Sequence, residues 1–82
     1  MQSEHSFAFD RQAMYRIRVE GRLEESWSDR LAGMTISVET SSAGLPTTTL
    51  VGELCDQASL AGVLNTLYEL HRPVLLVERL LA

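Results

Sequence analysis

The sequence has no lysine, a single cysteine and few aromatic residues. All seven basic residues are arginine, which indicates either a need for forked, bidentate donors or a bias in coding. The lone Cys55 cannot form an intrachain disulfide, which is typical of a reducing compartment. The formal net charge is −4, and an acidic domain repels phosphate backbones, so we expect no nucleic-acid partner.

Long hydrophobic runs are also missing. No apolar stretch approaches the roughly 20 residues that a helix needs to cross a bilayer, so we expect no membrane partner. The first residues show no basic start followed by an apolar run, which argues against a signal peptide. Together with the single cysteine, these features predict a cytoplasmic protein.

The length of 82 residues predicts one domain with a modest core. Residues 1–12 are mostly polar and are predicted to be a flexible tail, which leaves residues 13–82 as a single α+β domain. A chain this short buries only about 60–65% of the surface that its unfolded form exposes, so a second copy would add useful stability.

Apolar and polar residues alternate over 14–23 and again over 34–39, which predicts strands with one buried and one wet face. Residues 24–33 are predicted to form a short helix, with Ser26 and Asp29 as a capping box. Further elements follow along the chain. They are a β-branched strand over 47–54, a long amphipathic helix from Asp56 to before Pro73, and a fourth strand over 74–81 that is apolar on both sides, as for a strand that receives a crossover.

The order β, short α, β, β, long α, β predicts a two-layer α+β sandwich, with a four-stranded, mainly antiparallel sheet and both helices on one face. This is the order of the ferredoxin-like βαββαβ unit. The connection over 24–33 is close to the minimum for a parallel crossover. The alternative is therefore a βββαβ meander, in which the first three strands pair in sequence.

Residues that carry chemistry are few and scattered. Cys55 and His71 stand at opposite ends of the long helix and cannot form a nucleophile–base pair in one chain. Cys55 is predicted to be a small core residue. The histidines, the cysteine and the carboxylates lack the spacing of metal ligands, and the glycines form no phosphate loop. We expect no enzyme activity, no metal and no cofactor.

Asp56 stands where the long helix must begin. Its carboxylate would accept hydrogen bonds from backbone N–H groups in the first turn and stabilise the helix by about 1 kcal/mol. Gln57 follows in the same turn. The alternative is a ligand held by Asp56 and Gln57 at this helix N-terminus, where free N–H groups favour anions.

The segment "ELCDQASLAGVLNTLYELHRPVLLVE" resembles the strand–Asp–x–x–x–Leu–helix unit of ACT domains, with Asp56 and Leu60 at the matching positions. That resemblance implies a ferredoxin-like regulatory module that binds an amino acid at a dimer interface. The segments "GRLEESWSDRLAGMTISVE" and "TTTLVGELCDQASLAGVL" are similar to a family of short, stand-alone, uncharacterised bacterial proteins. This second resemblance implies no activity.

The leading hypothesis is a non-enzymatic cytoplasmic domain that forms a homodimer. Arg16 and Arg18 would pair across a two-fold axis with Glu20 or Glu39 of the second copy. The alternative is that these charges are solvated and contribute little. Two further hypotheses are a sensor of an amino-acid-like small molecule at a dimer interface and a small dimeric ferredoxin-like enzyme.

Overall fold

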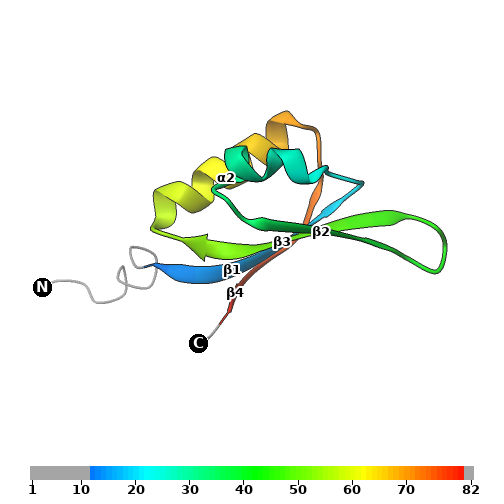
Figure 1. Ribbon diagram of the computed structural model, residues 1–82, viewed down its shortest axis with the longest axis horizontal. Helices are drawn as coiled ribbons and strands as arrows, with labels where there is room; N and C mark the ends of the chain where they lie inside the picture. The colour runs from blue at the N-terminus through cyan, green and yellow to red at the C-terminus, as the bar shows by residue number, and fades with distance from the viewer. Residues whose placement is uncertain (1–11, 81–82) are drawn as a thin grey trace, which may run out of the picture.

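A computed structural model describes residues 12–80, and the predicted tail therefore lies outside the described residues except for Gln12. The described chain forms four strands, one 3-10 helix and one α-helix (Figure 1). In chain order they are β1 (Ala13–Glu20), η2 (Glu25–Leu31), β2 (Thr35–Thr40), β3 (Pro46–Leu54), α2 (Gln57–Glu69) and β4 (Val74–Leu80).

The four strands form one open sheet in the order β2-β3-β1-β4, and every neighbouring pair is antiparallel. Strand β1 pairs with β3 on one side and β4 on the other, so the βββαβ meander is wrong. The connection through η2 carries the chain from β1 past β3 to β2. The connection through α2 carries it from β3 past β1 to β4. The two edge strands are consequently β2 and β4.

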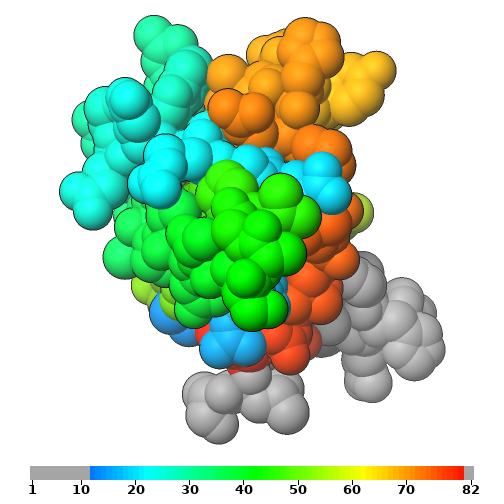
Figure 2. Space-filling model, turned by 90° about the vertical axis from the view of Figure 1, so that its right-hand side faces the viewer, coloured from blue at the N-terminus to red at the C-terminus, as the bar shows by residue number. Residues whose placement is uncertain are grey.

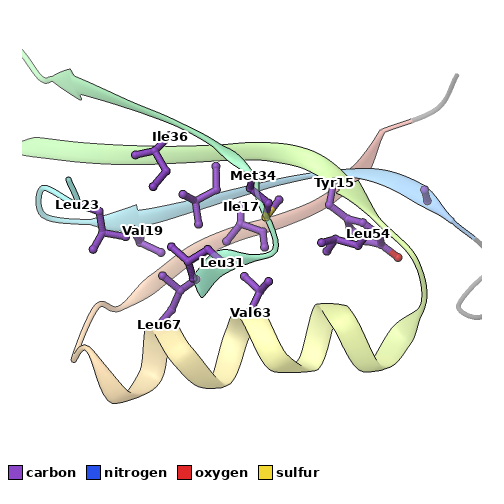
Figure 3. Packing of buried hydrophobic residues seen from close by; sticks show 12 residues of the cluster. Tyr15, Ile17, Val19, Leu23, Leu31, Met34, Ile36, Leu54, Val63 and Leu67 are labelled. Atoms are coloured by element: carbon purple, nitrogen blue, oxygen red, sulfur yellow. The ribbon is translucent and has the colours of Figure 1, made fainter. Parts of the chain in front are cut away.

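Both helices lie on one face of the sheet, which gives the predicted two layers (Figure 1). We call this the inner face and the opposite one the outer face. Val63 and Leu67 point from α2 toward the sheet, with Leu31 of η2 beside them (Figure 3). The alternation predicted for the first strand is confirmed, because its inward side chains are all buried. These are Tyr15, Ile17 and Val19, followed by Leu23.

The turn from β1 into η2 is fixed by Thr48, the one polar side chain that is fully buried among the described residues. Its hydroxyl donates to the Gly21 carbonyl at 2.6 Å and accepts from the Leu23 N–H at 3.0 Å. Gly21 has a φ of 88°, which glycine adopts without strain. Thr48 therefore satisfies the hydrogen-bonding capacity of two backbone groups that lie outside the strand-to-strand ladders of the sheet.

The entry into β2 packs closely on the sheet. A Cβ atom on Gly52 would lie 3.0 Å from the Met34 Cα and from its Cγ, so only glycine lets the two backbones approach this far. Tyr15 is the direct partner of Gly52 in the β1–β3 ladder. Met34 is fully buried in this close contact with Gly52, and it belongs to the same hydrophobic core as the residues of the central strands.

The short helix differs from its prediction. Its N-cap is Glu24, whose side chain makes no capping hydrogen bond, and Ser26 lies inside the helix, so the predicted capping box is wrong. Ser28 instead donates its hydroxyl to the Met34 carbonyl at 2.7 Å. Ala32 and Gly33 both have positive φ, which ends the helix in the left-handed region.

Candidate functional site

Strand β4 is the most unusual surface of the described chain. It lies at the edge of the sheet, hydrogen-bonded to β1 on one side, and no strand lies beyond it within residues 12–80. In Figure 2 its residues, coloured orange to red, run along the flank of the molecule beside the green β2–β3 hairpin. Four consecutive apolar residues of this strand are exposed. They are Val74 (41%), Leu75 (54%), Leu76 (38%) and Val77 (42%).

The register with β1 assigns these side chains to both faces. Val77 is opposite the buried Ile17, which places it on the inner face, and Leu76 is opposite Arg18 on the outer face. The register shifts between Arg18 and Val19, which leaves Leu75 as the extra residue of a bulge. The β4 edge, defined as residues 74–80, therefore exposes apolar side chains on both faces and an open row of backbone groups.

This exposure contradicts the burial expected for a strand that receives a crossover. Helix α2 packs on β3 and η2, and its buried residues are Val63 and Leu67. The helices therefore cover the centre of the sheet and the β2 side. The inner face of β4 stays open, although the sequence of the strand is apolar enough for a covered position.

The predicted interface residues lie together on the sheet, and both arginines have partners within the chain. Arg16 donates to Glu78 of β4 at 2.9 Å, and Arg18 lies 3.5 Å from Glu39 of β2. Glu20 takes part in no ion pair with residues 12–80. The intermolecular pairing of these residues stays a prediction, but the arginines do not need a second copy to meet a carboxylate.

Asp56 and Gln57 lie at the start of α2, where the sequence placed them. Asp56 is the N-cap, and its carboxylate accepts from the Ser59 N–H at 2.8 Å, so the capping prediction is confirmed. A depression of about 390 Å³ is lined by Asp56, Gln57, Ala58 and Ala61. All four lining residues are exposed, and the carboxylate that would receive a ligand cation or repel a ligand anion is already engaged by the helix.

The sequence prediction for Cys55 is wrong, because this residue is exposed rather than part of the core. It directly follows the buried Leu54 at the end of β3, and the chain turns outward there to begin α2. His71 lies beyond the other end of α2 with a positive φ of 59°. The helix separates the two side chains, in agreement with their predicted separation.

A second depression, of about 420 Å³, lies at the turn between α2 and β4. Its lining includes Tyr68, which is 80% exposed, and Pro73, which directly precedes β4. Arg72 stabilises this turn, because its guanidinium donates to the Arg22 carbonyl at 3.3 Å and packs against Gly21. The exposed side chains of Tyr68 and Pro73 therefore lie at the turn that leads into β4.

The described residues carry neither a cluster of metal ligands nor a membrane-spanning helix. Over residues 12–80, no group of three or more histidine, cysteine, aspartate or glutamate side chains could hold a metal ion. Neither described helix has the length and apolar character that crossing a lipid bilayer requires. The exposed apolar edge of β4 is therefore the candidate functional site of the described chain.

Sequence reasoning missed this feature for a definable reason. The apolar run Val74–Val77 predicts burial, because buried parallel strands have the same composition. The signal that could have corrected this is the short total length of helix, since a helix of 13 residues and a 3-10 helix of seven leave part of a four-stranded sheet uncovered. An apolar strand at an uncovered edge is a recognised sign of an association site.

The fold defines a small α+β domain with an open, four-stranded antiparallel sheet and two helices. A family model matches residues 14–78, a range that begins in β1 and ends in β4 and so spans the whole sheet. The chain belongs to this family, which is described as Domain of unknown function (DUF8691). The comparisons with curated proteins and with solved structures found no significant match.

Proposed function

We propose that this domain is a non-enzymatic, ferredoxin-like module that acts by self-association in the cytoplasm. The strand order and the two crossover connections support the ferredoxin-like classification. The single, exposed cysteine supports a reducing compartment. The scattering of Cys55 and His71 supports a role in binding rather than catalysis.

The observation that carries the proposal is the exposed apolar run of β4. Exposed apolar residues are common when they occur singly, but four in a row on an edge strand are not. Soluble proteins usually protect such edges with charges, proline or a covering element. Burial of this run against a second copy would remove apolar area from water at about 25 cal/mol for each Å².

The charged outer face is a weaker candidate for the contact. Arg16 and Arg18 already meet Glu78 and Glu39 of their own chain. Exchange of these partners for those of another copy would gain little, because exposed ion pairs contribute about 0–1 kcal/mol. The apolar edge therefore supplies a driving force that the charged face lacks.

The proposal is tested by the mass of the protein in solution over a wide concentration range. Sedimentation equilibrium or native mass spectrometry is expected to show a shift from 9.1 kDa to twice that mass as the concentration rises. Val77→Lys is expected to weaken the dimer strongly, because it places a charge in the contact. Ser37→Lys, on the exposed side of β2, is the matched control and should leave the dimer unchanged.

Two outcomes would count against this assignment. A mass of 9.1 kDa at every concentration would remove self-association altogether. A dimer that is lost in Arg18→Glu and kept in Val77→Lys would move the contact to the charged outer face, where Arg18 lies beside Glu39.

A further inference from the structure

The open edge of β4 places specific demands on whatever covers it. The covering group must supply backbone donors and acceptors along the strand, since the outward N–H and C=O groups have no ladder partner among the described residues. It must also supply apolar contacts on two faces, because Val77 lies on the inner face and Leu76 on the outer face. An extended strand meets both demands, which a helix or a flat surface does not.

The strand that best fits this edge is β4 itself. It is the edge strand with apolar side chains on both faces, whereas β2 exposes Thr35, Ser37 and Glu39. Its two charged residues, Glu78 and Arg79, have opposite signs, so two copies can meet without a net charge at the contact. Glu78 is also held by Arg16 of its own chain at 2.9 Å.

We infer that two copies of the chain pair antiparallel along β4 and so form one continuous eight-stranded sheet, with Val77 at the two-fold axis. This inference rests on the self-association proposed above and names its geometry. The axis is perpendicular to the sheet, so the helices of both copies lie on the same face. The contact is isologous, since each copy gives the same strand and receives it.

The position of the axis follows from the charges and the bulge. In such a dimer, residues directly opposite each other must lie on the same face of the sheet. The axis therefore lies between a residue and the same residue of the second copy, and not between two residues that are neighbours in sequence. An axis at Glu78 or at Arg79 would place two like charges opposite each other, which destabilises the pair. An axis at Leu76 would place the bulged Leu75 directly beside the axis, opposite Val77 of the partner subunit.

An axis at Val77 keeps like charges apart and moves the bulged Leu75 two residues away from the axis, where it faces Arg79 of the partner subunit. Val77 then faces Val77 of the partner subunit on the inner face, and Leu76 faces Glu78 of the partner subunit on the outer face. These three positions lie in the regular part of the β1–β4 ladder, beyond the bulge. The strand is also centred there, since Val77 is the middle residue of Val74–Leu80.

The size of the contact predicts its strength. Seven strand residues extend about 23 Å, which is short for a lasting interface on its own. Interfaces below about 1,200 Å² of total buried area are usually weak and reversible. We therefore expect a dimer whose population depends on the protein concentration.

Disulfide trapping tests this geometry in the full chain. The background is Cys55→Ser, which removes the exposed native thiol. Val77→Cys is expected to form a disulfide-linked dimer about tenfold faster than the control Ser37→Cys, because directly opposed strand residues lie within the distance that a disulfide spans. Ser37 is the matched control, since it lies near the middle of the other edge strand and is exposed.

A mixed experiment tests the register. With the axis at Val77, Leu76→Cys protomers should link slowly to each other but rapidly to Glu78→Cys protomers, because these two positions oppose each other. Rapid linking of Leu76→Cys or Glu78→Cys with itself would overturn the register. All of these substitutions lie at exposed positions, so folding should be preserved.

The outcomes separate this inference from the proposed function. A chain that is dimeric by mass but links no faster at Val77→Cys than at Ser37→Cys overturns the β4 pairing and leaves self-association standing. A chain that stays at 9.1 kDa overturns both. A monomer whose β4 amides are nevertheless protected from hydrogen exchange would assign the edge to another segment of the same chain, which also overturns the pairing.

Discussion

Strands β2 and β4 are the two edges of one sheet, and each carries one glutamate that reaches an arginine of β1. Glu39 of β2 pairs with Arg18, and Glu78 of β4 pairs with Arg16. The edges differ in everything else. Strand β2 alternates, with Ile36 buried on the inner face and polar side chains outside. Strand β4 is apolar for four residues and exposed on both faces.

The difference comes from how the short and long helices cover the sheet. Helix η2 packs on β2 and on α2, while α2 packs on β3. The β2 edge is thus covered on the inner face and made compatible with water by its own polar residues. Over Val74–Val77 the β4 edge has neither form of protection from residues 12–80. The same sheet therefore has one edge that is covered and polar and one that exposes an apolar run.

The largest expected effect comes from truncation of the buried inward side chain of β2, which we compare with the same change on β4. Ile36 is 6% exposed, so Ile36→Ala is expected to lower the free energy of unfolding by about 2–5 kcal/mol, through lost burial and a cavity. Val77→Ala should cost less than about 1 kcal/mol in dilute protein, because Val77 is already exposed. Urea denaturation at low concentration measures both, and equal costs would show that β4 is covered in the monomer.

Gly52→Ala tests the close packing between β3 and Met34 at the entry into β2. The added Cβ would lie 3.0 Å from the Met34 Cα, which is backbone and cannot move away as a side chain would. We expect a loss of about 1–3 kcal/mol from overpacking, measured by thermal or urea denaturation. Gly62→Ala is the control, since nothing lies within 4 Å of a Cβ there, and this change in a helix interior should be neutral or stabilising.

Thr48→Val tests the turn that positions η2 over the β2 side. The substitution keeps the shape of the side chain but leaves the Gly21 carbonyl and the Leu23 N–H without their buried partner. The expected loss is about 1–3 kcal/mol in urea denaturation. Thr49→Val, on the outer face of the same strand, is the matched control and should change stability little. A loss of similar size in the control would mean that the hydrogen bonds of Thr48 contribute nothing specific.

The two ion pairs are expected to give the smallest effects. Glu39→Gln and Glu78→Gln should each change the free energy of unfolding by about 0–1 kcal/mol, because both pairs are half exposed to solvent. We expect the two substitutions to differ only in their effect on association, because Glu78 lies at the proposed β4–β4 contact and Glu39 does not. A change of the dimer mass profile in Glu39→Gln alone would assign the contact to the outer face.

Much of the fold could be predicted from local patterns. The alternation at Tyr15, Ile17 and Val19 identifies an inner face without knowledge of the partner strands. Asp56 predicts the start of α2, because an N-cap is a local hydrogen bond within one turn. Such features depend on residues a few positions apart, so the sequence contains them directly.

Features that depend on distant segments could not be predicted in the same way. The exposure of Cys55 and of Val77 depends on where α2 lies over the sheet, which no local pattern encodes. The partners of Arg16 and Arg18 depend on strand order, since Glu78 and Glu39 come from the two opposite edges. The same apolar run therefore predicts a strand correctly and its burial wrongly.

Hydrogen exchange of the two edge strands, measured at increasing protein concentration, tests the central claim most directly. The account predicts that amides in residues 74–80 become protected as the concentration rises, because pairing occupies their outward N–H groups, while amides in residues 35–40 keep a constant rate. Protection that rises in 35–40 instead, or that changes in neither strand up to the highest concentration reached, would contradict it.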